Sequence, residues 1–262
     1  MSRGGLGRKR EGLEGRLRAC GRIAVAWSGG ADSTLLLAVA GRLLPGRVTA
    51  LHAHTSVHTA AERQHVETMA AELGIALRIV EEDPLSWPEF VANPANRCYL
   101  CKKRLYRRFV ELAGREGLGR LLDGTNADDL GEERPGLQAL AELGIGTPLA
   151  DSGLTKAEVR ELSAQLGLAT WNRPSNSCLA TRIPHGTAID GKTIATVAAA
   201  ESVLHQAGFP NCRVRIVGGG WALVELRGGG ADRTLWQGRG AEVVRELRRL
   251  GCGKVFLEID AG

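Results

Sequence analysis

From residue 23 to residue 166 the chain alternates short apolar runs with longer segments of helical periodicity. Strands followed by helices of this length form β-α-β units, whose strands lie parallel. We therefore predict an α/β domain with a doubly wound parallel sheet. The expected strands are residues 23–27, 48–53, 77–80 and 120–123, and the expected helices are 34–40, 59–73, 97–113 and 155–166, the last with a Thr155-x-x-Glu158 capping box.

The order of elements changes after Pro184 and predicts a second, smaller domain. A helix, a two-stranded hairpin across three glycines, a further helix and a last strand indicate a small C-terminal α+β domain. These elements are expected at residues 192–208, 212–217, 221–226, 241–250 and 254–259. We expect three parts in all: a basic, flexible arm over 1–20, the α/β domain over 21–185 and the small domain over 186–262.

The positive charge of the chain is concentrated at its N-terminus. Residues 1–22 contain seven of the 34 basic residues and two of the 29 acidic ones, so they carry the whole net charge of +5. The remainder has 27 residues of each sign and is neutral. A nucleic-acid partner is therefore disfavoured, because such a partner needs a basic surface on the folded body. Residues 1–20 are expected to be dispensable for catalysis.

Composition excludes several classes of protein. Hydrophobic residues make up 44% of the 262 residues, which supports a full globular core. No apolar run approaches the ~20 residues of a membrane-spanning helix, and the N-terminus lacks the apolar segment of a secretory signal. We expect a cytoplasmic protein, in which six cysteines are thiols, metal ligands or catalysts. Assembly into a homo-oligomer stays open.

Residues 28–33 read Ser-Gly-Gly-Ala-Asp-Ser and lie between the first expected strand and the first expected helix. At such a junction backbone N–H groups and the helix dipole converge on an anion, and glycines let the backbone approach it closely. A simple turn capped by Asp32 or Ser33 is the alternative, but the position after the first strand favours a phosphate loop. The missing G-x-x-x-x-G-K-[ST] pattern disfavours a Walker-type NTPase that releases the γ-phosphate.

This segment resembles the SGGxDS loop of the PP-loop ATP pyrophosphatases, a superfamily that includes GMP synthetases and tRNA thiolases. Four further segments are similar to the LarE family, the pyridinium-3,5-bisthiocarboxylic acid mononucleotide synthases: residues 97–102 (RCYLCK), 123–129 (DGTNADD), 173–184 (RPSNSCLATRIP) and 213–215 (RVR). The resemblance implies an adenine nucleotide α-hydrolase-like fold. It also implies an enzyme that adenylylates a pyridinium dicarboxylate mononucleotide and makes thiocarboxylates from its carboxylates, toward the nickel-pincer nucleotide cofactor.

The same resemblance implies that ATP and Mg²⁺ bind at the phosphate loop. Asp32 would place the Mg²⁺ that neutralises developing charge. Asp128 follows the strand that ends at residue 123, at the edge where α/β proteins bind ligands, and would contact the nucleotide or the metal. A loop-capping role for Asp128 is an equal alternative. Four residues would hold the pyrophosphate: Ser28, Gly29, Gly30 and Ser33.

Cys98 and Cys101 permit two interpretations. They share one helical face with Leu105 and Phe109, so they could be small core residues. The surrounding segment is strongly basic, however, and cations near a helix N-terminus lower the pKa of a thiol and favour the thiolate. Some LarE members are thought to hold a [4Fe–4S] cluster on three cysteines. The resemblance therefore implies that Cys98, Cys101 and Cys178 are its ligands.

Cys178 lies in a loop between Pro174 and Pro184 and is not on a periodic apolar face, so a core role is the weaker alternative. Arg182 or Lys102 is expected to stabilise its thiolate or to hold a substrate carboxylate. In other LarE members one cysteine gives up its sulfur and becomes dehydroalanine, and the sequence leaves open whether Cys178 is such a sacrificial donor. Three cysteines lack partners at ligand spacing and are interpreted as structural: Cys20, Cys212 and Cys252.

Arg213 and Arg215 lie two residues apart on an expected strand and project to one side of it. Paired guanidinium groups suit a phosphate, and the family assigns the matching positions to the phosphate of the substrate. The alternative is a cross-strand ion pair, because a hairpin centred on Gly219 places Arg213 opposite Glu225. Glu201, on the preceding helix, is a weaker candidate for this site.

Three other functions compete with sulfur transfer to a small nucleotide. A PP-loop tRNA thiolase also combines this loop with a C-x-x-C pair, but the neutral body of the chain counts against it. An amidotransferring synthetase would form a C–N bond through an AMP intermediate and would not need Cys178. A non-catalytic nucleotide or metal sensor would release no pyrophosphate.

Overall fold

The computed structural model describes residues 3–131, 135–173 and 177–259. The chain forms two compact units, the first made of residues 1–83 and 96–176 and the second of 84–95 and 177–262. The boundary thus lies at residue 177 rather than near 185, and a short earlier segment joins the second unit. Asn93 explains this, because its Nδ2 donates to the carbonyls of Pro184 and Thr187 at 2.8 Å each. The motif residues 174–176 lie outside the described residues.

The first unit contains the predicted parallel sheet. Strands β2 and β1 are the inner ones, and the order β3-β2-β1-β4 has all three neighbouring pairs parallel. At its carboxyl end Ala26 of β1 pairs with Leu51 of β2 and with Asp123 of β4. The strands are β1 (Ile23–Ala26), β2 (Val48–Thr55), β3 (Ala76–Glu82) and β4 (Arg120–Asp123).

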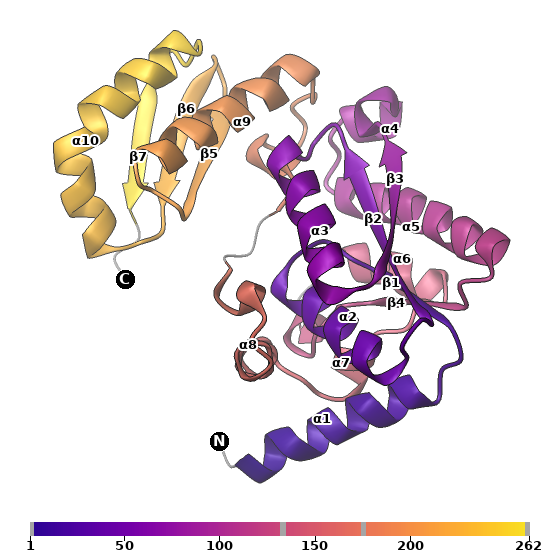
Figure 1. The fold of residues 1–262 in the computed structure, drawn as a ribbon. Coiled ribbons are helices and arrows are strands. Elements are labelled where there is room, and N and C mark those ends of the chain that lie inside the picture. The colour runs from indigo at the N-terminus through magenta and orange to yellow at the C-terminus, as the bar shows by residue number, and fades with distance from the viewer. Residues whose placement is uncertain (1–2, 132–134, 174–176, 260–262) are drawn as a thin grey trace. The chain divides into compact units, whose positions relative to one another are not determined.

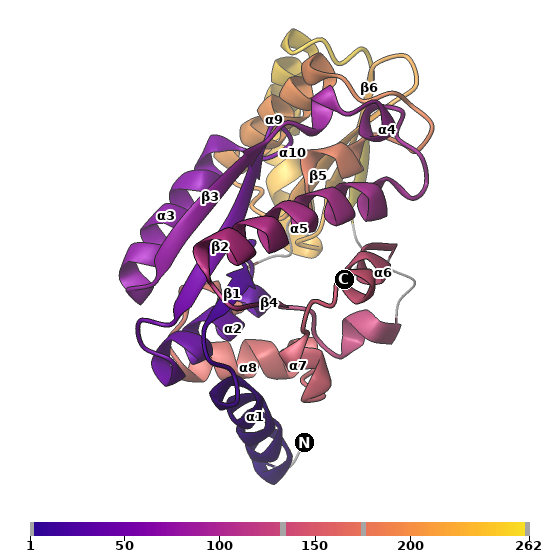
Figure 2. The ribbon, with the colours of Figure 1, turned by 90° about the vertical axis from the view of Figure 1, so that its right-hand side faces the viewer.

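Helices cover both faces of this sheet, as a doubly wound fold requires (Figure 2). Alternate residues of β1 face opposite sides: Val25 packs with α2, α3 and α8, and Ala24 packs with α5 and α6. The helices are α2 (Ala31–Leu43), α3 (Ala60–Leu73), α5 (Arg97–Glu116), α6 (Pro135–Glu142), α7 (Pro148–Asp151) and α8 (Lys156–Gln165). Short 3₁₀ turns are η2 (Asp128–Gly131) and η3 (Ala169–Asn172).

The expected flexible arm is instead a helix, α1 (Arg3–Arg18). Leu13 and Leu17 of this helix are 0% and 1% exposed and belong to the core that α2 and α8 also build. Lys9 adds an ion pair with Glu158 of α8 at 2.7 Å. The prediction failed because the basic residues dominate the segment, whereas its few leucines lie one turn apart on the buried face.

The second unit has the predicted order of helix, two strands, helix and strand (Figure 1). Strands β5 and β6 form the expected antiparallel hairpin, and β7 pairs parallel to β6. Helices α9 and α10 contribute to one apolar core with these strands. The elements are α9 (Gly191–Gln206), β5 (Cys212–Val217), β6 (Trp221–Leu226), α10 (Gly230–Arg249) and β7 (Val255–Ile259), preceded by η1 (Pro84–Ser86), α4 (Pro88–Val91) and η4 (Leu179–Arg182).

Helix α10 begins eleven residues earlier than the expected start at residue 241. Its first eleven residues contain three glycines, which made a helix unfavourable by propensity. Leu235 and Trp236 nevertheless pack against the core of the second unit, and buried Asp232 accepts a hydrogen bond from the Gly228 N–H at 2.6 Å. Tertiary packing therefore outweighs local propensity here.

None of the described helices is both long enough and apolar enough to cross a bilayer.

Candidate active site

The order of strands reverses between β1 and β4, so their carboxyl ends lie side by side at a topological switch point. Loops that leave two adjacent parallel strands in opposite directions open a crevice there, and ligands of α/β proteins bind in it. Residues 28–30 leave β1, and residues 124–129 leave β4. Both predicted nucleotide-binding segments therefore lie at one edge of the sheet.

The phosphate loop places the N-terminus of α2 at this edge. Gly29 has φ +75°, and Gly30 is the N-cap of α2 and offers no side chain to accept a hydrogen bond from the first N–H groups of the helix. Those donors and the helix dipole are available to an anion. Ser28 and Ser33 face each other with their hydroxyl oxygens 3.1 Å apart.

Trp27, the residue before the phosphate loop, is held in place by two hydrogen bonds. Its indole Nε1 donates to Thr34 Oγ1 at 3.0 Å, and its carbonyl accepts from buried His52 Nδ1 at 2.9 Å. Thr34 and His52 were not identified as site residues from the sequence, because Thr34 looks like an ordinary residue of an apolar helix and His52 like one of an apolar strand.

The loop after β4 packs directly against the start of α2. A Cβ added to Gly124 would lie 2.7 Å from the backbone nitrogen of Ser33, so only glycine permits this approach. Asn126 Nδ2 donates to Asp32 Oδ1 at 2.9 Å and joins the two loops. The Asn126 N–H in turn donates to Asp129 Oδ2 at 3.1 Å. Asn126 was missed as a site residue, although it stands in the same DGTNADD segment as Asp128.

The environment of Asp32 is suited to a bound cation. Burial raises the pKa of its carboxyl above the ordinary value, and the hydrogen bond from Asn126 and the charge of Lys156 oppose that rise. A bound metal ion would stabilise the ionised form of such a carboxylate, because its charge replaces the solvation that is lost on burial.

Asp128 has the contacts of a loop cap. Its Oδ2 accepts from the Lys156 N–H at the start of α8 at 2.9 Å, and its own N–H donates to Asn126 Oδ1 at 3.0 Å. These bonds favour the capping alternative over direct contact with the nucleotide. Asn126, rather than Asp128, reaches Asp32.

Helix α5 carries Cys98, Cys101 and Lys102. Cys98 is exposed and Cys101 half-buried, whereas Phe109 and Ala113 form the buried face of the helix. The core interpretation of Cys98 is therefore disfavoured. Lys102 points instead to the end of β4, with its Nζ 3.6 Å from Asp123 Oδ2 and 5.0 Å from the centre of the Tyr106 ring.

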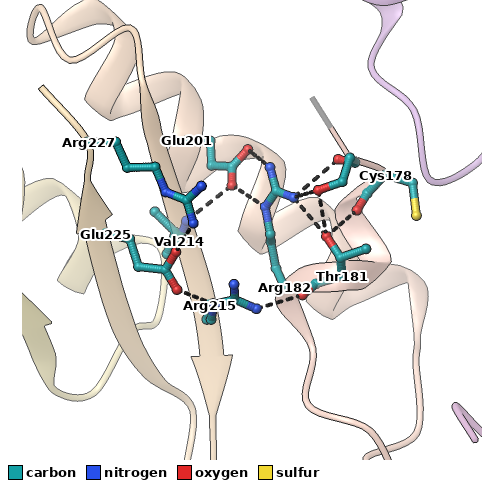
Figure 3. Close-up of polar contacts among 9 residues, drawn as sticks. Cys178, Thr181, Arg182, Glu201, Val214, Arg215, Glu225 and Arg227 are labelled. Atoms are coloured by element: carbon teal, nitrogen blue, oxygen red, sulfur yellow. Dashed lines mark hydrogen bonds and ion pairs between the residues drawn. The ribbon is translucent and has the colours of Figure 1, made fainter. Parts of the chain in front are cut away.

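In the second unit the loop that carries Cys178 is held by a buried ion pair (Figure 3). Arg182 is 2% exposed, and its Nε donates to Glu201 Oε1 at 2.7 Å. Its Nη1 donates to Ser177 Oγ at 2.7 Å and to Thr181 Oγ1 at 2.8 Å. Thr181 donates two hydrogen bonds to the Cys178 carbonyl, one from its N–H at 3.0 Å and one from its hydroxyl at 2.9 Å.

This geometry changes the role expected for Arg182. Its guanidinium lies against Glu201 and the backbone of the loop, and Figure 3 shows the Cys178 sulfur directed away from it. Burial and the carboxylate partner direct the guanidinium inward, where it positions the Cys178 loop through Ser177 and Thr181. Glu201 also accepts from the Val214 N–H at 3.1 Å and ties the loop to β5.

Arg213 and Arg215 project to the same side of β5, as predicted, because Cys212 and Val214 are buried on the other side. Arg213 pairs with Glu225 in register, yet Glu225 forms its ion pairs with Arg215 and with Arg227, the latter at 3.1 Å. Arg215 Nη1 also donates to the Thr181 carbonyl at 3.0 Å. The cross-strand pair thus exists, but with a different arginine.

Positive charge is in excess around this strand. Four guanidinium groups lie around it, those of Arg182, Arg213, Arg215 and Arg227, against the carboxylates of Glu201, Glu225 and Asp232 in the described part of the chain. Burial and then the positive charges of Arg227, Arg182 and Arg215 lower the pKa of Arg213, while Glu225 opposes this. An anion bound at Arg213 would relieve this repulsion, which supports the predicted phosphate site.

The remaining cysteines have the properties of structural residues. Burial raises the pKa of Cys212 to about 12 and also raises the pKa of Cys252, so neither is a ready thiolate. Cys20 donates its S–H to the Arg16 carbonyl at 3.4 Å. Within each unit, no group of three or more described His, Cys, Asp or Glu residues is arranged to hold a metal ion. Cys98 and Cys101 belong to the first unit and Cys178 to the second.

Comparison with known proteins agrees with this fold. Residues 10–130 match the asparagine synthase family, a branch of the PP-loop superfamily. With the loop after β1 at the switch point, this match defines an ATP-using enzyme of the PP-loop ATP pyrophosphatase superfamily.

Similarity to individual proteins identifies the family. The chain is 37% identical over 212 residues to pyridinium-3,5-bisthiocarboxylic acid mononucleotide synthase of Lactiplantibacillus plantarum, covering 80% of this chain and 76% of that protein. It is 38% identical over 194 residues to an uncharacterised protein of Synechocystis sp., covering 74% and 72%. It is 26% identical over 239 residues to an uncharacterised protein of Methanocaldococcus jannaschii, covering 91% and 90%. The chain therefore belongs to the LarE family, the family of the pyridinium-3,5-bisthiocarboxylic acid mononucleotide synthases.

Proposed function

We propose that this protein activates a carboxylate of a pyridinium dicarboxylate mononucleotide with ATP and then replaces the activated oxygen with sulfur. The observation that carries the proposal is the phosphate loop at the β1–β4 switch point in a chain of the LarE family. The product is a thiocarboxylate, an intermediate of the nickel-pincer nucleotide cofactor. We place the reaction in the cytoplasm, where the described cysteines, none of which forms a disulfide, stay reduced.

The residues of the first unit serve the activation step. The substrate carboxylate oxygen attacks the α-phosphorus of ATP, the bond from that phosphorus to the β-bridging oxygen breaks, and pyrophosphate departs into the loop of residues 28–33. The N–H groups at the start of α2 stabilise the charge that develops, and Mg²⁺ held by Asp32 would supply further positive charge there. A sulfur nucleophile then attacks the acyl carbon, and AMP leaves with the original oxygen.

The residues of the second unit serve the substrate. Arg213 and Arg215 bind the phosphate of the mononucleotide, which is supported by the excess of guanidinium groups on that side of β5. Arg182 and Glu201 hold the Cys178 loop in place through the buried ion pair. Positioning a reactive group in this way can contribute several kcal/mol to a barrier.

We infer further that Cys98, Cys101 and Cys178 are ligands of a [4Fe–4S] cluster. The donor chemistry fits, because all three are thiols with exposed or half-buried side chains and two lie at i and i+3 on α5. When bound, a cluster with three protein ligands would supply an iron position for an added sulfide.

The proposed reaction is tested with the purified protein, the pyridinium substrate, ATP and sulfide under anaerobic conditions, followed by mass spectrometry of the small molecules. Thiocarboxylate that forms only when ATP is present supports the proposal. Substrate recovered unchanged, or converted to an amide when ammonia is supplied, would contradict it.

The sulfur source is tested separately by cysteine variants. Cys98→Ala and Cys178→Ala should lose bound iron and sulfide, whereas the control Cys20→Ser should keep both. The intact mass of the wild-type protein should be unchanged after turnover. A loss of hydrogen sulfide mapped to Cys178, with Cys98→Ala still active, would replace the cluster by a sacrificial cysteine.

A further inference from the structure

Helix α3 lies directly against the phosphate loop, beside β2 (Figure 1). A side chain at Gly29 would place its Cβ 2.9 Å from Val66 Cγ1 and 3.5 Å from Cδ2 of the His65 imidazole. The same Cβ would lie 3.9 Å from His65 Nε2, which is bonded to Cδ2. The ring edge that carries Nε2 therefore faces the backbone of the loop.

Among the described residues, no group forms a hydrogen bond of ordinary geometry with His65 Nε2, although the atom is enclosed. The Gly29 carbonyl is close enough to raise the pKa of the imidazole but does not satisfy Nε2. Burying a polar atom away from water without a hydrogen-bond partner is unfavourable, and most buried polar atoms in native proteins are hydrogen-bonded. Its position beside a loop built for phosphate indicates that the missing partner is a ligand.

The charges around His65 suit an anionic ligand. Arg173 Nη1 donates to the Gly29 carbonyl at 3.5 Å, so a guanidinium and an imidazole flank the same glycine. Burial and then Arg173 lower the pKa of His65 below 6.5, and the Gly29 carbonyl, Glu72 and Glu62 oppose this. Without ligand the imidazole is thus neutral at neutral pH. The negative charge of a bound polyanion would raise the pKa of His65 and favour the imidazolium.

We propose that His65 is a further nucleotide-binding residue, which donates a hydrogen bond from Nε2–H of its imidazolium to the pyrophosphate part of ATP and to the pyrophosphate product. The added proton comes from water when the ligand binds and returns to water when pyrophosphate leaves. The inference deepens the proposed function and rests on its assignment of pyrophosphate to the loop of residues 28–33.

The test measures proton uptake when magnesium pyrophosphate binds. Calorimetric titrations of the full chain at neutral pH are run in two buffers that differ in ionisation enthalpy, for the wild type and for His65→Gln. The wild type should take up close to one proton more than the variant. Its affinity should exceed that of the variant about tenfold near pH 6, and the difference should vanish above about pH 8. Titration of pyrophosphate itself is shared by both proteins and cancels in the comparison.

Two controls keep the outcomes distinct. His205→Gln, at an exposed position of α9, should match the wild type in uptake and affinity. The unfolding curve of His65→Gln should match that of the wild type, so that weaker binding is not a folding defect. Equal uptake and affinity in wild type and His65→Gln would overturn the inference alone. Failure of both proteins to bind pyrophosphate would overturn the inference and the proposed function together.

Discussion

Asp32 shows how one side chain joins electrostatics to catalysis. Burial raises the pKa of its carboxyl, so in the folded protein the ionised form is penalised above that raised pKa. Asp32→Asn removes the penalty and keeps the shape. We expect the variant to lose pyrophosphate release, while its free energy of unfolding at pH 7 equals or exceeds that of the wild type.

The two effects are measured by a coupled pyrophosphate assay and by urea unfolding. The Mg²⁺ concentration for half-maximal activity of the wild type should also rise as the pH falls toward the raised pKa, because the proton competes with the metal. A clearly destabilised Asp32→Asn variant, or one that retains activity, would refute this account of Asp32.

The pair Arg182–Glu201 is a second prediction at the scale of residues. Arg182→Met leaves the Glu201 carboxylate buried beside apolar groups, so we expect a loss of about 3–5 kcal/mol in the free energy of unfolding. The double variant Arg182→Met/Glu201→Leu should recover much of that loss, since no charge is then buried alone. Denaturant titrations measure both values. Equal stability of Arg182→Met and wild type would show that the pair is not buried in solution.

At the scale of elements, α1 is part of the folded core. Leu17→Ala removes a side chain that is 1% exposed, and we expect a loss of about 2–5 kcal/mol in the free energy of unfolding. The exposed substitution Arg18→Ala, one residue away, serves as control and should cost less than about 0.5 kcal/mol. Removal of residues 1–20 should therefore destabilise the first unit, which replaces the expectation of a dispensable arm. A truncated protein as stable as the full chain would contradict this result.

The ion pair between α1 and α8 should make that docking depend on pH. Burial raises the pKa of Glu158, but hydrogen bonds from Lys9 and Thr155 outweigh it and hold the pKa below 4.5. A depressed carboxyl pKa adds stability above the unfolded value, and this is lost as the pH falls through the folded one. Lys9→Met should thus cost up to about 1 kcal/mol at pH 7, and this cost should disappear as the pH falls through the lowered pKa of Glu158. Unfolding curves at several pH values test this, and a cost independent of pH would contradict the role of the ion pair.

Most elements of the fold were predictable because local pattern and tertiary packing agree in them. The β5–β6 register, with Arg213 opposite Glu225, follows from a hairpin centred on its glycines. The capping box Thr155–Glu158 is likewise formed as its sequence indicates. Helix α1 and the first half of α10 were not predictable. The basic residues of α1 and the glycines of α10 disfavour a packed helix, and both segments are stabilised by leucines and a tryptophan whose tertiary contacts the sequence does not show.

The candidate site was predictable in its segments but not in its contacts. The phosphate loop, the segment after β4 and the basic start of α5 stand out in the sequence. The bond from Asn126 to Asp32, the direction of Arg182 toward Glu201 and the approach of His65 to Gly29 do not. These contacts join residues far apart in the chain, and without a folded backbone their spacing carries no signal.

At the scale of the whole molecule, we propose that ATP is cut between its α- and β-phosphates. The proposal rests on the position of the loop after β1 at the switch point and on the absence from the sequence of a Walker-type G-x-x-x-x-G-K-[ST] motif. The direct measurement is product analysis with ATP labelled at the α-phosphate, in the presence of the pyridinium substrate. We predict AMP and pyrophosphate in amounts equal to the thiocarboxylate formed. ADP and orthophosphate as the products would contradict the account.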